Sequence, residues 1–150
     1  MHAAPAEPSA QLVRTIARWV LAAFLGFAGV NHFTNAEEFL AQVPAWIPAP
    51  EAAVAVSGVV EIVLALALVA VGRRRAAVGW STAAFFVLVF PGNVSQLVTG
   101  TDAFGLDSDA ARAVRLLLQP VLVVWAVWCT GAWYSWRHRA RAAGESPRSS

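Results

Sequence analysis

Charge is scarce in this sequence, and lysine is missing altogether. Only 13% of the 150 residues are charged and 58% are hydrophobic, whereas an ordinary soluble domain carries about 25% charged residues. All 11 basic residues are arginines. The composition therefore excludes an ordinary soluble domain and predicts a membrane protein, and the length is enough for one domain.

Cysteine is almost as scarce. Cys129 is the only one, which excludes an internal disulfide and a CxxC pair. The sequence also lacks a phosphate-binding glycine loop and a Ser/His/Asp arrangement. No metal site is predicted, because His32 and Glu61 do not make a ligand set alone, and His2 and His138 are expected on the other side of the membrane. These absences favour a chain without catalytic activity of its own, although they leave enzyme function open.

Four apolar segments are long enough to cross a bilayer, which takes roughly 20 helical residues. They are expected at about residues 12–33, 52–72, 76–98 and 110–134. The first is interpreted as a retained transmembrane helix rather than a signal peptide, because no convincing small-residue cleavage site follows it. The predicted fold class is all-α: an integral membrane four-helix transmembrane bundle spanning residues 12–134.

The arginines predict the topology of this bundle. Nine of the 11 fall in three regions that four spans place on one side: Arg14 and Arg18, Arg73 to Arg75, and Arg137, Arg139, Arg141 and Arg148. The positive-inside rule then places both termini in the cytoplasm. We expect a multi-pass protein of the inner (cytoplasmic) membrane. Residues 1–11 are expected to be a disordered cytoplasmic tail. Residues 135–150 are expected to be a basic cytoplasmic tail that contacts lipid headgroups, not nucleic acid.

A short helix is expected between the first two spans. Asn35 to Glu38 resembles a capping box, in which the Asn35 side chain caps the helix and Glu38 reaches back to it. Phe39, Leu40 and Val43 then follow at helical spacing. The pattern predicts an amphipathic helix lying on the membrane surface.

Small residues and one proline are expected to shape the helix contacts. Gly26, Ala28 and Gly29 form a small-residue face on the first span, suited to close packing within the chain or in a homo-oligomer. Pro91 lies inside the third span and removes a backbone donor. The carbonyl that it frees, about four residues back, must find a partner because lipid offers none.

Polar side chains are expected in the outer half of all four spans. At 1.5 Å per residue, Glu61 lies roughly 14 Å below the outer surface, where an uncompensated charge is costly. Arg115 and Gln119 are four residues apart and share a helix face. We expect Glu61 to pair with Arg115, with Gln119, Asn93 and His32 supplying hydrogen bonds. These five side chains are the candidate ligand pocket.

The role of this pocket stays open at the level of sequence. The charged pair could be purely structural and fix the register of the helices. Alternatively, the chain binds or moves a small molecule or protons, with Glu61 as the protonatable group. The two alternatives predict different responses to neutralising Glu61, since only the second makes binding or flux depend on its carboxylate.

Several motifs in their order resemble the DoxX-like membrane proteins over about residues 15–134. They are Gly29-Val-Asn-His-Phe33, PAWIPAP at 44–50, Ser57-Gly-Val-Val-Glu61, Arg73 to Arg75, FPGN at 90–93, and Arg115-Leu-Leu-Leu-Gln119 before a Trp-rich helix. The resemblance implies a four-helix membrane bundle in which the five pocket candidates correspond to recurrent polar positions.

The resemblance also implies a function. It implies a non-catalytic membrane subunit or accessory protein of a redox or quinone-linked system. Its partners would be the lipid bilayer and oxidoreductase subunits, and quinone is the one cofactor implied. The missing cysteine pair departs from a redox-active pattern, which argues against autonomous oxidoreductase activity.

Overall fold

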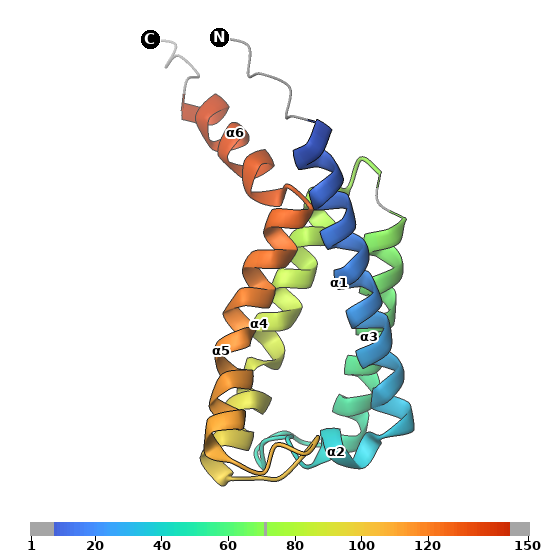
Figure 1. Cartoon of the computed structure of the whole chain (residues 1–150), viewed down its shortest axis with the longest axis vertical. Helices are drawn as coiled ribbons and strands as arrows, with labels where there is room; N and C mark the ends of the chain where they lie inside the picture. The colour runs from blue at the N-terminus through green and yellow to red at the C-terminus, as the bar shows by residue number, and fades with distance from the viewer. Residues whose placement is uncertain (1–7, 71, 145–150) are drawn as a thin grey trace.

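Long apolar helices make up most of the chain. The computed structural model describes residues 8–70 and 72–144. Its helices are α1 (Pro8–Thr34), α2 (Ala36–Leu40), α3 (Pro50–Val69), α4 (Arg75–Thr99), α5 (Asp109–Cys129) and α6 (Ala132–Gly144). The four longest, α1, α3, α4 and α5, are each long and apolar enough to cross a membrane. Within the described ranges there is no strand, so the predicted all-α four-helix bundle is confirmed (Figure 1).

The outer limits of the bundle differ from those predicted. α1 begins at Pro8, so residues 8–11 are helical rather than disordered, and residues 1–7 lie outside the described part of the chain. The last span ends at Cys129 instead of Tyr134, because Gly131 adopts a φ of 69° and left-handed glycine is a common helix terminator. α6 then leans away from the bundle (Figure 1). The expected basic tail is thus helical to Gly144, and residues 145–150 lie outside the described residues.

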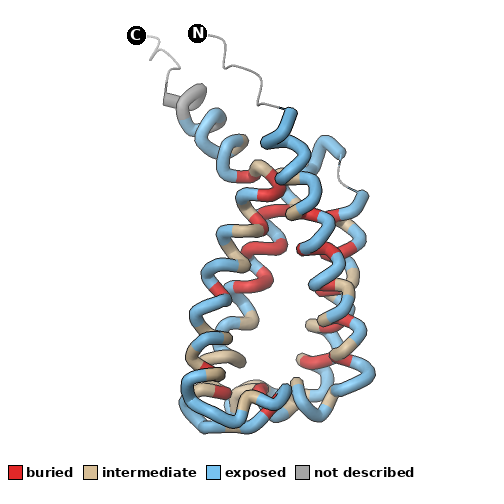
Figure 2. The backbone as a smooth tube through the Cα atoms, viewed as in Figure 1, coloured by how far each residue is buried: buried red, intermediate tan, exposed pale blue. Residues whose placement is uncertain are grey.

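The four long helices form two pairs. α1 packs along α3, and α4 packs along α5, while contacts between the pairs are fewer. The apolar core joins the pairs mainly in the half of the bundle that holds both described termini (Figure 2). Its largest members are Leu21 and Leu25 of α1, Leu64 and Leu68 of α3, and Phe85 and Phe86 of α4. The other half therefore depends on different contacts.

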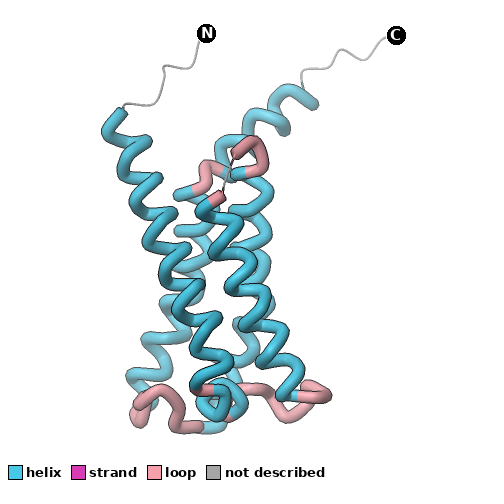
Figure 3. Tube along the Cα trace, turned by 90° about the vertical axis from the view of Figure 1, so that its right-hand side faces the viewer, coloured by secondary structure: helices cyan, strands magenta, loops and turns pink. Residues whose placement is uncertain are grey.

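The two ends of the bundle carry opposite charge. One end holds the start of α1, the α3–α4 turn and α6 (Figure 3). We call it the arginine-rich end, for Arg14, Arg18, Arg73 to Arg75 and Arg137. The other holds α2, the 41–49 connection and the 100–108 loop. We call it the acidic end, for Glu37, Glu38, Glu51, Asp102, Asp107 and Asp109. This separation is the one expected for four spans with both termini on one side.

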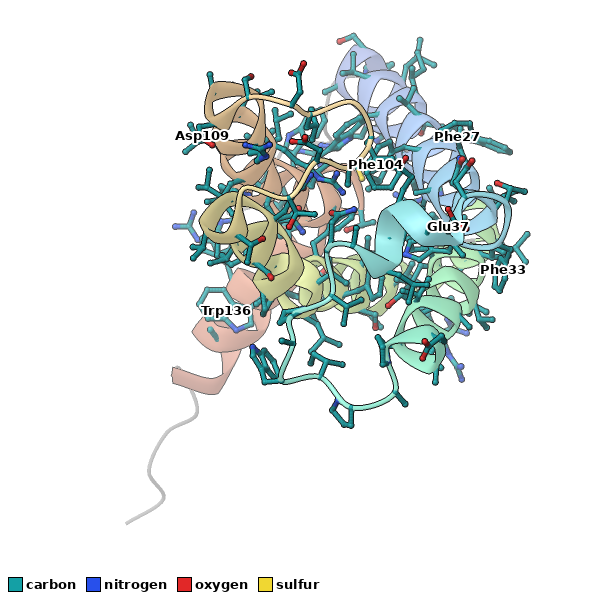
Figure 4. The ribbon with its side chains drawn as sticks, turned by 90° about the horizontal axis from the view of Figure 1, so that it is seen from below. Phe27, Phe33, Glu37, Phe104, Asp109 and Trp136 are labelled. Carbon is teal, nitrogen blue, oxygen red and sulfur yellow. The ribbon has the colours of Figure 1, made fainter. Side chains whose placement is uncertain are left out.

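Apolar side chains cover the outside of the helices. Phe27 is 72% exposed, Leu88 75% and Leu117 69%. Phe27 and Phe33 point away from the bundle when it is seen from the acidic end (Figure 4). Exposed apolar surface on this scale is rare on a monomer in water, and it suits contact with lipid tails.

α2 confirms the short helix after the first span but not its capping box. The Asn35 side chain makes no cap hydrogen bond; its Nδ2 donates to Asn31 Oδ1 at 2.7 Å. Glu38 does not reach back either, because its Oε2 accepts the backbone N–H of Phe104 at 2.6 Å. The carboxylate thereby ties α2 to the 100–108 loop, a contact between distant parts of the chain that a local motif does not include.

Candidate functional site

Two glycines bring α1 and α3 together near the acidic end. A Cβ on Gly58 would lie 2.6 Å from His32 Cβ and 3.1 Å from the Gly29 carbonyl oxygen. A Cβ on Gly29 would lie 2.9 Å from the Gly58 carbonyl oxygen and 3.1 Å from Glu61 Cβ. Neither position has room for a side chain. This close approach, predicted for Gly29 from its small neighbours, sets His32 directly opposite Glu61.

His32 and Glu61 form a buried pair across this contact. His32 Nδ1 lies 3.0 Å from Glu61 Oε2, and the two residues are only 7% and 8% exposed. The same Nδ1 lies 2.9 Å from the Ala28 carbonyl oxygen. A carbonyl oxygen can only accept a hydrogen bond, so this contact requires the proton on Nδ1. Because that N–H serves the carbonyl, Glu61 Oε2 is buried without an aligned donor in the described residues.

This arrangement fixes the chemistry of the imidazole ring. A proton held on Nδ1 leaves Nε2 as the nitrogen that can accept another proton. The carboxylate beside the ring would stabilise the imidazolium that results, as a carboxylate does beside a histidine base. Across residues 8–70 and 72–144, Nε2 makes no hydrogen bond. The pair can therefore accept a hydrogen bond from a bound molecule at Nε2, next to the carboxyl group of Glu61.

The expected ion pair between Glu61 and Arg115 is wrong. Arg115 instead places its guanidinium carbon 4.9 Å from the centre of the Phe104 ring. The reason is the pairing of the helices: α5 packs on α4, whereas α3 packs on α1. The nearest polar group to Glu61 is accordingly on α1, and Arg115 belongs to the other pair.

Asn93 and Gln119 form a second polar pair, between α4 and α5. Asn93 Nδ2 donates to Gln119 Oε1 at 2.8 Å, and Gln119 Nε2 donates to the Phe86 carbonyl oxygen at 2.7 Å. That carbonyl lies five residues before Pro91, one residue before the Val87 carbonyl that the missing Pro91 N–H was expected to leave free. Gln119 uses both ends of its amide in these bonds. The second pair therefore holds α4 against α5 near Pro91.

The five predicted pocket residues thus fall into three places rather than one cluster. His32 meets Glu61, Asn93 meets Gln119, and Arg115 lies against Phe104. No hydrogen bond or ion pair of the described residues joins the first pair to the second. We call His32 and Glu61 the histidine–glutamate pair; His32 Nε2 and Glu61 Oε2 make no hydrogen bond within the described residues.

A stack of rings connects the histidine–glutamate pair to Arg115. The His32 ring stacks on Phe39 of α2 with centroids 3.7 Å apart. Phe39 and Phe104 meet edge to face with ring centroids 4.8 Å apart. The Arg115 guanidinium lies over the Phe104 ring. Phe104 accordingly lies near the middle of the acidic end (Figure 4). The three rings form a cover that spans the two helix pairs.

The 100–108 loop is held in a strained turn. Phe104 has a φ of 56° and Gly105 a φ of 69°, and Leu106 N donates to the Ala103 carbonyl at 3.1 Å. Positive φ at both central residues defines a type I′ turn, and a phenylalanine in this region costs of order 1–3 kcal/mol. The Glu38 carboxylate and the ring contacts hold Phe104 there.

Arg112 organises the same loop and was not among the predicted residues. Its side chain is buried and pairs with Asp102 and with Asp109, the latter at 2.8 Å. Its Nε also donates to the Thr101 carbonyl at 3.2 Å. The i,i+3 spacing of Asp109 and Arg112 was a signal for this pairing.

Further buried polar side chains escaped the sequence prediction, among them Gln96, Gln42 and Arg18. Gln96 is 1% exposed, donates to the Ala103 carbonyl at 3.4 Å, and leaves Oε1 without a partner. Gln42 is 6% exposed and donates to the Glu38 carbonyl. Arg18 is buried at the arginine-rich end. Each is a polar residue within or beside an apolar run, a visible signal that does not by itself say which residues are buried.

Within the described ranges, no group of three or more His, Cys, Asp or Glu side chains is placed to hold a metal ion.

Residues 21–130 match the family described as "Domain of unknown function (DUF8561)". Curated proteins and solved structures gave no match.

Proposed function

The chain belongs to the DUF8561 family, and we propose that it binds a proton-donating small molecule at the histidine–glutamate pair within the membrane. The observation that carries the proposal is the orientation of His32. Its Nδ1 faces the Ala28 carbonyl and Glu61, and its Nε2 makes no hydrogen bond to the described residues. A ligand hydroxyl can donate to Nε2, and the Glu61 carboxylate favours transfer of that proton.

We place the arginine-rich end in the cytoplasm. Support comes from the concentration of arginines at the end that holds both described termini, which the positive-inside rule assigns to the cytoplasmic side. The membrane is then the cell membrane, and the histidine–glutamate pair lies in its outer half. The ligand would therefore be a molecule of the outer leaflet or of the space beyond it.

A quinol is the ligand that we favour. It has two hydroxyl donors and a flat ring, and the aromatic side chains of Phe39 and Phe104 lie next to His32, where offset or edge contacts with such a ring are favourable. The DoxX-like resemblance points the same way. Since one cysteine cannot form a dithiol pair, this proposal assigns electron transfer to a partner oxidoreductase subunit and a non-catalytic accessory role to this chain.

Quinol binding can be measured directly with the full chain in detergent. Tryptophan fluorescence would be followed during titration with a short-chain ubiquinol and, separately, its quinone. We expect His32→Gln and Glu61→Gln each to weaken quinol binding about tenfold, the value of one hydrogen bond to a charged group. Asn93→Ala is the matched control, because it removes a half-buried amide from the other pair. Equal binding by all three variants, or no binding by the wild type, would refute the proposal.

A purely structural role makes a different prediction. If the pair only fixes packing, Glu61→Gln should destabilise the bundle, and replacing both residues by leucine should largely restore stability. Our proposal allows the same recovery of stability but requires that the double variant no longer bind quinol. Binding that survives in the stable double variant would favour the structural role.

A further inference from the structure

Arg18 is a buried cation with no hydrogen-bond or ion-pair partner among residues 8–70 and 72–144. It lies on α1 near the arginine-rich end and is 9% exposed. Its Nη1 is fully enclosed and meets no hydrogen-bond acceptor in the described part of the chain. Trp125 of α5 donates to the carbonyl of the preceding residue, Ala17, at 3.1 Å, which fixes the local backbone. Leaving a buried guanidinium unpaired is costly, so a missing anion is indicated.

The neighbours of Arg18 make the shortage of negative charge worse. The titratable groups that act on it electrostatically are Arg75, which repels it, and the thiol of Cys129. That thiol is buried and donates to the Ala126 carbonyl at 3.6 Å, so it is neutral. Every Asp or Glu of residues 8–70 and 72–144 lies at the acidic end, apart from Glu61 in α3. The described chain therefore offers Arg18 no counterion.

The start of α4 adds a second feature of an anion site. α4 begins at Arg75, and the residue that precedes it, Arg74, provides no side-chain cap. The first N–H groups of a helix have no intrahelical acceptors and favour a negative group. This N-terminus and the unpartnered Arg18 are independent observations at the same end of the bundle.

We propose that Arg18 and Arg75 bind a phosphate group at the arginine-rich end. Guanidinium forks match the oxygens of a phosphate and bind it through two parallel hydrogen bonds. The phosphate can belong to an anionic lipid headgroup or to a free phosphate ion, and both would neutralise the same two cations. The site lies at the opposite end from the histidine–glutamate pair and does not depend on the function proposed for that pair.

The thermal midpoint of the full chain in detergent tests this site. Tryptophan fluorescence would report unfolding during titration with phosphatidylglycerol, phosphatidylcholine or inorganic phosphate. We expect phosphatidylglycerol to raise the midpoint of the wild type with saturation, and Arg18→Gln and Arg75→Gln to weaken its apparent affinity about tenfold. Arg73→Gln is the matched control, since Arg73 lies on the same turn and is not an electrostatic neighbour of Arg18.

The arms of the experiment separate the two sources of phosphate. A rise with phosphatidylglycerol alone identifies a lipid, and an Arg18-dependent rise with inorganic phosphate identifies a free ion. If Arg18→Gln does not fold, Arg18→Lys keeps the charge without the fork and should still bind more weakly than the wild type. The site is overturned if neither anion raises the wild-type midpoint. It is also overturned if the Arg18 and Arg75 variants respond as Arg73→Gln does.

Discussion

Replacing Gly58 by alanine should push α1 away from α3 at the point where His32 meets Glu61. The new Cβ would lie 2.6 Å from His32 Cβ, and ordinary contact begins at 3.4 Å, so one helix must retreat by at least about 0.8 Å. His32 Cβ is attached directly to the backbone and cannot rotate away. Inserting one carbon into a packed contact costs about 1–3 kcal/mol, and the 3.0 Å contact of the pair would lengthen as well.

The matched control is Gly26→Ala, on the same pair of helices. Its Cβ would lie 3.7 Å from Ala65 Cβ, which is ordinary contact, and alanine favours helix over glycine by about 0.8–1.0 kcal/mol. We expect Gly26→Ala to unfold at or above the wild-type midpoint, and Gly58→Ala to lose about 1–3 kcal/mol. Unfolding in detergent, followed by tryptophan fluorescence, measures both. Equal midpoints for the two variants would refute the close contact and, with it, the placement of the histidine–glutamate pair.

Two other predictions concern the half of the bundle next to the acidic end. Gln119→Leu should cost about 1–2 kcal/mol, since interhelical hydrogen bonds in membranes average about 0.6 kcal/mol each and two are lost, to Asn93 and to the Phe86 carbonyl. Adding Asn93→Leu should then cost little more in a double-mutant cycle, and strictly additive losses would contradict the pairing. Arg112→Gln should change the free energy of unfolding by no more than about 1 kcal/mol, because the partners of Arg112 are exposed carboxylates. It should nevertheless speed cleavage of the 100–108 loop by added protease, and an unchanged cleavage rate would show that Arg112 does not order the loop.

The four spans were predictable because each is an apolar run of sufficient length with few charges. The end of the last span was less predictable. Trp133 and Tyr134 continue the apolar pattern beyond Gly131, whose left-handed conformation breaks the helix. The hydrophobic pattern of a segment indicates whether it contacts lipid or the protein core. Where this helix ends depends on the backbone conformation of Gly131.

The partner of Glu61 was not predictable from depth alone. Counting 1.5 Å per residue placed Glu61 roughly 14 Å below the outer surface, whereas His32 is the next-to-last residue of the predicted first span. In the structure, Gly58 of α3 lies against Gly29 and His32 of α1. α3 therefore begins farther toward the acidic end than α1 ends, and the two side chains are level. Residue counts give positions along one helix; the relative shift of two helices depends on their packing.

The pairing of the helices also determines where the other candidate site residues lie. Sequence ranked Arg115 as the charged partner of Glu61 because opposite charges attract, without information on which helices are neighbours. In the structure α5 packs on α4, so Arg115 lies over the Phe104 ring. The polar content of the acidic half was predictable, and its division into two pairs was not.

Nitrogen NMR of the histidine-labelled chain tests the central claim most directly, because it reports which ring nitrogen of His32 carries the proton. Removing His2 and His138 by substitution would leave a single histidine signal to assign. We predict that neutral His32 carries its proton on Nδ1, and that addition of a short-chain ubiquinol shifts the Nε2 resonance. A proton on Nε2, with Nδ1 free, would contradict the arrangement with Ala28 and Glu61 and the proton-accepting site built on it.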